Sequence, residues 1–264
     1  MELYEYARPD IMAGKTILYL HGFASSGQNG TVRAMTTLLP ETRIIAPDIP
    51  VEPQEALTFL NDLCAKENPD LIIGASMGGM YAELLRGFDR ILFNPAFFLA
   101  DTLQKNNGLG RQEFHNPSRD GQTSFLVTKG LLESFREVSS HCFENLPDNA
   151  SDLSSFGEMT DERDHVYGMF GTQDNFVTGT FDVFRKYYAN AIHFEGEHYM
   201  DDSVLLHSVL PVIERIDDKQ EKRSKPVMFI ALTDVLLDLR NGVSRGKSID
   251  EMETYGSAVK AFSE

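Results

Sequence analysis

Short apolar runs alternate with amphipathic patterns along most of the chain, and this alternation limits the possible folds more than any other feature. The apolar runs predict strands at 16–20, 43–46, 71–73, 90–93, 166–170 and 191–194. Helical patterns at about 31–39, 54–66, after residue 76 and at 181–188 lie between most of them. Strands that alternate with helices form right-handed crossovers and a mostly parallel sheet. The sequence therefore predicts an α/β fold with helices flanking the sheet and ligands at the carboxyl ends of the strands.

The stretch at about 97–164 interrupts the alternation. It combines turn signals, such as Asn116-Pro117, with a helical pattern at about 125–138. A connection of this length is far beyond an ordinary loop, and it contains enough apolar residues to pack against other parts of the protein. We expect a cap insertion at 97–164 over the strand ends of a main domain at 1–216. A flexible surface insertion is the alternative.

The segment at 217–264 follows a predicted helix at 203–216 and has a different character. It opens with a charged run at 217–225, which predicts a linker or a solvated turn. The next stretch, 226–238, resembles the first motif of haloacid-dehalogenase-type phosphatases, but Ala231 and Thr233 stand where that family has its aspartates. We expect a C-terminal extension whose role the sequence does not identify.

The overall composition is that of a globular protein, with 42% hydrophobic and 24% charged residues. The formal net charge of −16 repels phosphate backbones and anionic membrane surfaces, so we expect neither nucleic acid nor a membrane as a partner. Cys64 and Cys142 are the only cysteines, and neither has a second ligand at metal-site spacing. The chain has no signal-peptide pattern and no membrane-length apolar run. We therefore expect a cytoplasmic protein that needs no metal or cofactor.

The residues Gly74-Ala75-Ser76-Met77-Gly78 lie between a predicted strand and a predicted helix. They match G-x-S-x-G, the nucleophile elbow, in which a strained turn exposes a serine oxygen at the edge of a sheet. Glycine suits both ends of the motif because a Cβ there would collide with the neighbouring strand and helix. The alternative is a glycine-rich turn whose serine only caps the helix.

A nucleophilic serine needs a base and a group that orients the base. Asp174 follows the strand at 166–170, and His198 follows the strand at 191–194. In this kind of fold the three groups occur in the order serine, acid, histidine, which is the order found here. We therefore predict Ser76 as nucleophile, Asp174 as acid and His198 as base. Glu197 is the closest alternative acid, but its position next to His198 disfavours a good hydrogen-bond geometry.

Acyl transfer also builds negative charge on the former carbonyl oxygen, which backbone N–H groups stabilise. We predict one donor at Met77, directly after the nucleophile. The second is expected at Phe23, in a loop after the first strand where Gly22 permits close approach of the backbone and His21 holds the loop.

A substrate pocket is predicted near these donors. We place His21 and Gly22 in it together with Phe97 and Phe98, which follow the strand at 90–93. The aromatic rings would favour a short or medium acyl chain over a charged one.

Five motifs together carry a resemblance to a known family: Leu20-His21-Gly22-Phe23-Ala24-Ser25-Ser26, and the motifs at 74–79, 93–96, 171–174 and 196–198. The set resembles the α/β-hydrolase superfamily and, within it, the small YqiA-like bacterial serine esterases, over about residues 15–215. This resemblance implies a bacterial cytoplasmic esterase with its nucleophile at Ser76, acid at Asp174 and base at His198. The insertion is longer than in compact members, and the tail has no counterpart.

The leading hypothesis is thus a serine carboxylesterase or thioesterase that cleaves small acyl esters through an acyl-enzyme intermediate. Two alternatives remain open. The first is a non-catalytic binding protein on an α/β-hydrolase fold, and the second is a carbon–carbon or peptide-bond hydrolase with the same three residues. Neither the oligomeric state nor the physiological substrate is predicted.

Overall fold

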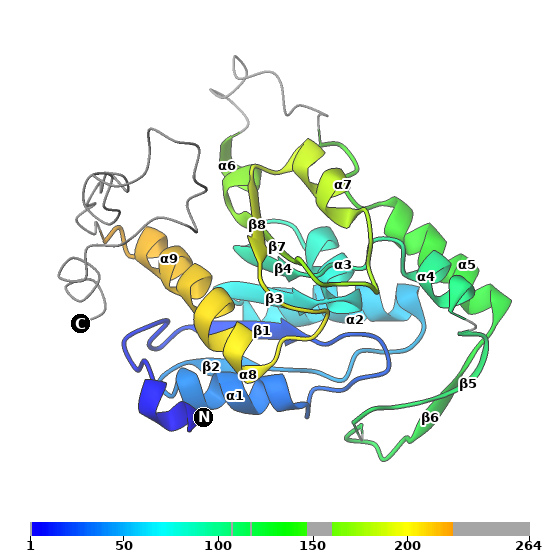
Figure 1. Ribbon diagram of the computed structural model, residues 1–264, viewed down its shortest axis with the longest axis horizontal. Helices are drawn as coiled ribbons and strands as arrows, with labels where there is room; N and C mark the ends of the chain where they lie inside the picture. Colours follow the sequence, from blue (N-terminus) through cyan, green and yellow to red (C-terminus); the bar gives the residue numbers. More distant parts are fainter. Residues whose placement is uncertain (1, 107, 117, 147–159, 224–264) are drawn as a thin grey trace, which may run out of the picture. The chain divides into compact units, whose positions relative to one another are not determined.

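The computed structural model describes residues 2–106, 108–116, 118–146 and 160–223 (Figure 1). The chain divides into two units, Met1–Glu221 and Lys222–Glu264. Most of the predicted C-terminal extension, including the stretch that resembles the phosphatase motif, lies outside the described residues. Within the described ranges, no helix combines the length and the apolar character that crossing a membrane requires.

The first unit contains a six-stranded parallel sheet with the strand order β2-β1-β3-β4-β7-β8 (Figure 1). The predicted mostly parallel sheet flanked by helices is therefore confirmed. The strands are β1 (Thr16–Leu20), β2 (Arg43–Ile45), β3 (Leu71–Ala75), β4 (Arg90–Phe93), β7 (Val166–Gly171) and β8 (Asn190–Phe194). β4 and β7 are direct neighbours in the sheet, although the insertion separates them in the sequence.

Helices cover both faces of the sheet because successive side chains of a strand point to opposite sides. Ile17 and Tyr19 belong to one hydrophobic cluster, whereas Leu18 and Leu20 belong to the other. The first cluster includes residues of α1 (Gly30–Leu38), α8 (Asp202–Val204), the π-helical turn η3 (Leu205–Val209) and α9 (Leu210–Gln220). The second includes residues of α2 (Pro53–Glu67), α3 (Met77–Leu84), the insertion between β4 and β7, and α7 (Thr180–Tyr187). A short 3-10 helix, Leu3–Tyr6, precedes β1.

Helix α9 continues past the predicted helix end into the charged run that was expected to form a linker. Asp217 is buried within this helix, and Lys15 Nζ lies 2.7 Å from its Oδ1 atom. Lys15 also pairs with Glu221 at 2.6 Å. The ion pairs keep this charged turn folded against the segment before β1, and the linker prediction is therefore wrong for residues 217–220.

The insertion between β4 and β7 contains α4 (Leu99–Lys105), an antiparallel hairpin of β5 (Gly110–Glu113) and β6 (Ser124–Val127), α5 (Lys129–Ser140) and α6 (Thr160–Asp164). The predicted helix at 125–138 is right only from residue 129 onward. Thr128 Oγ1 accepts a hydrogen bond from the N–H of Leu131 and caps α5, so the residues before it are available to pair with β5.

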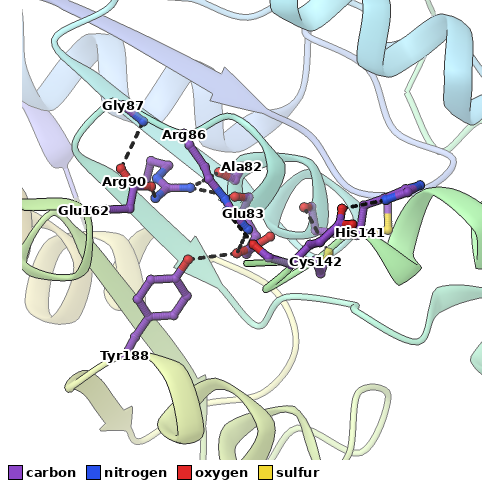
Figure 2. Close-up of polar contacts among 11 residues, drawn as sticks. Ala82, Glu83, Arg86, Gly87, Arg90, His141, Cys142, Glu162 and Tyr188 are labelled. Atoms are coloured by element: carbon purple, nitrogen blue, oxygen red, sulfur yellow. Dashed lines mark hydrogen bonds and ion pairs between the residues drawn. The ribbon is translucent and has the colours of Figure 1, made fainter. Parts of the chain in front are cut away.

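A buried polar cluster lies at the C-terminal end of α3, and Figure 2 shows how its side chains face one another. The side chain of Arg90, at the start of β4, is 0% exposed and forms an ion pair with Glu162. Its guanidinium also donates to the main-chain oxygens of Ala82, at 3.1 Å, and Glu83, at 2.6 Å. These are terminal carbonyls of a helix, which lack partners within the helix. Arg90 therefore caps α3 from inside the protein.

The side chain of Glu83 is also 0% exposed and lies in the same cluster. The Tyr188 hydroxyl donates to Glu83 Oε1 at 2.8 Å, and Arg86 lies 3.7 Å from that atom. Arg86 in turn donates to the main-chain oxygen of Glu144 at 2.6 Å. The cluster joins α3 both to α7 and to the later part of the insertion.

Candidate active site

Ser76 occupies a sharp corner between β3 and α3. Its backbone has φ +55° and ψ −114°, a conformation that L-residues rarely adopt. A Cβ added to Gly74 would lie 2.1 Å from the carbonyl oxygen of Gly78, and one added to Gly78 would lie 2.1 Å from that of Leu20. Both positions therefore require glycine. This is the strand-to-helix setting that the serine motif demands.

The structure brings Ser76, His198 and Asp174 into one hydrogen-bonded chain. The Ser76 hydroxyl lies 3.0 Å from His198 Nε2, and His198 Nδ1 lies 2.8 Å from Asp174 Oδ2. The other oxygen of Asp174 accepts hydrogen bonds from the N–H groups of Phe176, at 2.7 Å, and Val177, at 3.1 Å. All three side chains stand at the carboxyl ends of strands. Glu197, the alternative acid, is not part of this chain of hydrogen bonds.

The Asp174 carboxyl is 4% exposed, and several effects act on its charge. Burial alone would raise its pKa, but the hydrogen bond and charge of His198, together with the two backbone N–H groups, hold the pKa below its usual value. An ionised carboxylate at this position fixes the proton of His198 on Nδ1. It thereby leaves Nε2 free to accept the proton of Ser76.

The predicted oxyanion donors, Met77 and Phe23, both adjoin the nucleophile. Met77 opens α3, where N–H groups lack partners within the helix. Among the described residues, neither its N–H nor that of Phe23 donates to a protein acceptor. A Cβ added to Gly22 would lie 3.4 Å from Ser76 Cβ, so the loop that carries Phe23 passes directly beside the serine.

His21 is hydrogen-bonded to this loop. The N–H of Ile49 donates to His21 Nε2 at 3.0 Å, and His21 Nδ1 therefore donates to the carbonyl oxygen of Gly22 at 2.8 Å. The C=O and N–H of a trans peptide point in opposite directions, so the N–H of Phe23 points away from His21. Burial lowers the pKa of His21, which keeps the imidazole neutral and able to accept.

A cavity of about 1180 Å³ opens at the candidate site. Ser76, His198, Gly22 and Phe23 line it, and so do residues of α4 and β5 from the insertion: Leu99, Thr102, Leu103, Gln112 and Glu113. The N–H of His115, just after β5, donates to the carbonyl oxygen of Ala24 at 2.7 Å. The insertion thus forms one wall of the cavity and contacts the loop beside the serine.

Three residues predicted for the pocket lie elsewhere. Phe97 is buried against Phe143, with ring centroids 4.8 Å apart, and belongs to the core. Phe98 is 46% exposed and does not line the cavity. His21 lies behind the loop and lines a second cavity of about 650 Å³. Residues that immediately follow a strand need not face the strand ends, because the chain turns there.

Sequence reasoning missed two aromatic residues on the cavity wall. The Phe176 ring centroid lies 5.3 Å from that of His198, and the Tyr199 ring centroid lies 5.5 Å from it. Both rings are more than half exposed. Each follows a predicted triad residue by one or two positions in the sequence, a signal that could have identified them.

Sequence reasoning also overlooked the role of Asn94, at the end of β4. Asn94 is buried, and its side chain reaches the main chain on both sides of the predicted triad.

Across the described ranges, no group of three or more His, Cys, Asp or Glu side chains is arranged to hold a metal ion.

The parallel sheet, its flanking helices and the serine elbow define an α/β-hydrolase fold. Residues 16–202 match an uncharacterised protein family, UPF0227, and the chain belongs to this family. Several solved structures are similar over most of their length. One of them is Est1E of Butyrivibrio proteoclasticus, solved with ferulic acid, to which this chain is 14% identical. The alignment covers 82% of this chain and 92% of Est1E, with a TM-score of 0.48.

Two further structures show a comparable likeness. The esterase RhEst1 of Rhodococcus sp. ECU1013 is 13% identical, with 77% of this chain and 91% of that chain covered and a TM-score of 0.44. An α/β hydrolase of Novosphingobium aromaticivorans DSM 12444 is also 13% identical, with 76% and 90% covered and a TM-score of 0.43.

Proposed function

We propose that the protein is a serine hydrolase that cleaves small acyl esters or thioesters. One observation carries this proposal: the Ser76 hydroxyl lies 3.0 Å from the imidazole of His198, which Asp174 holds from the other side at 2.8 Å. A serine hydroxyl is a weak nucleophile at neutral pH. An adjacent oriented base is the arrangement that activates it.

The reaction proceeds in two halves. Ser76 Oγ attacks the carbonyl carbon while its proton passes to His198 Nε2, and the N–H groups of Met77 and Phe23 stabilise the resulting oxyanion. The tetrahedral intermediate then collapses, and the departing alcohol or thiol takes the proton from His198. In the second half, water attacks the acyl-enzyme and gives a proton to His198. The acid is released when Ser76 recovers that proton.

The cavity wall indicates which acyl groups the enzyme accepts. Apolar side chains, among them Phe23, Leu99, Leu103 and Val177, line it. No lysine or arginine of the described residues lines the cavity, whereas Glu113 and Asp202 do. A neutral acyl chain is therefore favoured over an anionic one, because a buried anion without a partner is costly.

The test combines active-site labelling with turnover. A fluorophosphonate probe should label the wild-type protein, and p-nitrophenyl esters and acyl thioesters of graded length should be hydrolysed. Ser76→Ala should abolish both, whereas Ser140→Ala, which removes an exposed hydroxyl outside the cavity, should leave both intact. If a correctly folded wild-type protein is neither labelled nor active, a non-catalytic binding role becomes the better explanation.

A further inference from the structure

We infer that Asn94 is the positioning residue that fixes the catalytic base, an inference that rests on the proposed function. Asn94 lies at the carboxyl end of β4, and its side chain is bonded to both neighbouring loops. Its amide nitrogen donates to the main-chain oxygens of Glu197, at 3.0 Å, and His198, at 3.1 Å. Its amide oxygen accepts from the N–H of Gly171 at 2.7 Å. One side chain therefore connects the loop of the base to the strand that leads to the acid.

The backbone of Asn94 explains how its side chain reaches these partners. The N–H of Asn94 still donates to the carbonyl oxygen of Met169 at 2.8 Å, in line with the ladder between β4 and β7. In a continuing parallel ladder, the next donor, the Gly171 N–H, would bond to the main-chain oxygen of residue 94. Asn94 instead has φ +41°, which turns the chain away. Its side-chain oxygen takes the place of the missing main-chain acceptor.

The base loop depends on this contact. Main-chain bonds hold the loop as far as Gly196, whose oxygen accepts from the N–H of Gln173 at 2.9 Å. Beyond Gly196, no other hydrogen bond among the described residues reaches the main chain of Glu197 or His198. Asn94 is also 2% exposed, so water cannot easily replace its amide. Asn94 thus holds the main chain of the base, whereas Asp174 bonds to its imidazole.

Asn94 does not itself line the substrate cavity, so its effect should appear in kcat rather than in KM. A displacement of about 1 Å at a catalytic group costs on the order of 10²-fold in rate. We expect its substitution to lower kcat by about 10- to 100-fold while KM changes little.

Two variants separate the contacts of the side chain from the backbone conformation. Asn94→Asp keeps the shape, the tolerance for positive φ and the acceptor for Gly171, but it loses both donors to the base loop. Asn94→Gly adopts positive φ freely and loses all three bonds. Both variants should therefore lose kcat. If the residue served only the backbone turn, Asn94→Gly would retain wild-type kcat.

A control variant accounts for any loss of stability. Thr42→Val removes a buried hydroxyl that bonds to the main chain of Ile11 and Met12 before β1. It should lower the melting temperature without changing kcat. Thermal unfolding of all variants then shows whether a lower rate merely follows lower stability.

A spectroscopic measurement tests the inference without turnover. The proton of His198 that bonds to Asp174 should give the most downfield imidazole signal in the ¹H NMR spectrum of the wild-type protein. Asn94→Asp and Asn94→Gly should broaden or shift this signal, whereas Thr42→Val should not. Retention of wild-type kcat and of this signal in both Asn94 variants would overturn the inference. An inactive, unlabelled wild-type protein would instead refute the proposed hydrolase.

Discussion

His198 Nε2 lies 3.0 Å from the Ser76 hydroxyl, although the two residues are 122 positions apart in the sequence. The contact exists because β3 and β8 both end at the same edge of the sheet, with β4 and β7 between them. Parallel strands bring their carboxyl ends to one place, where distant residues can combine into one site.

Asp174 should be essential as the group that orients the base. Asp174→Asn keeps the shape of the side chain but cannot stabilise the imidazolium, so kcat should fall by several orders of magnitude, about 10⁴-fold. Glu197→Gln removes the neighbouring carboxylate, which makes no hydrogen bond to His198. It should retain near wild-type turnover of p-nitrophenyl esters. The assignment would be reversed if the Glu197 variant lost activity and the Asp174 variant kept it.

His21 should make stability depend on pH in the weakly acidic range. Burial lowers its pKa in the folded protein, so the unfolded chain binds the proton more readily. The stability that neutral His21 contributes is therefore present above the unfolded pKa of about 6.5 and is lost as the pH falls below it. The free energy of unfolding, measured in urea at pH values above and below about 6.5, should decline more steeply with falling pH for the wild-type protein than for His21→Asn. Parallel declines would contradict this assignment.

The elbow glycines should tolerate no side chain. A Cβ at Gly74 or Gly78 would overlap a backbone oxygen at 2.1 Å, and backbone atoms cannot move aside as a flexible side chain can. Gly74→Ala and Gly78→Ala should each destabilise the fold by about 3 kcal/mol or more. Gly30→Ala is the matched control, because the nearest atom to its Cβ is an arginine nitrogen 3.8 Å away. Its free energy of unfolding, measured in urea, should stay within about 0.5 kcal/mol of wild type.

The buried arginine at the start of β4 should matter far more than an exposed one. Arg90→Met would leave Glu162 and two helix carbonyls without their partner, and we expect a loss of about 3–5 kcal/mol. Arg136→Met breaks a pair with Asp101 whose side chains are 43% and 56% exposed, and it should cost less than about 1 kcal/mol. Similar losses in chemical unfolding would show that the Arg90 cluster does not hold α3.

Local patterns made much of the fold and site predictable. The apolar run before Ser76 and the stripe after it indicated a strand and a helix, because each depends on neighbouring residues. Asp174 and His198 could be proposed because each comes shortly after a strand. Asn94 belongs to the motif at 93–96, but its partners Glu197 and His198 lie 103 and 104 positions away, and no local signal connects them.

The errors have physical causes as well. Phe125 fits the helical spacing of Leu131, Leu132 and Phe135, but Thr128 supplies an N-cap that starts the helix after it. Asp217 was assigned to a solvated linker because charge usually faces water, whereas here Lys15 neutralises it in the interior. Phe97 was expected on the pocket wall but contributes to the core instead. For Asp217 and Phe97 a tertiary contact outweighed the local pattern, whereas for Phe125 a local N-cap decided where the helix begins.

The insertion occupies a crossover between β4 and β7, two strands that pair directly with each other. Their register is set by the ladder and not by the length of the chain that joins them. On the proposed function, one part of the surface that selects an acyl group is thus encoded in a stretch of sequence that contains none of the three predicted catalytic residues. Changes to the cavity-lining residues of α4 and β5 could therefore alter the choice of acyl group without changing the strands that carry the catalytic residues.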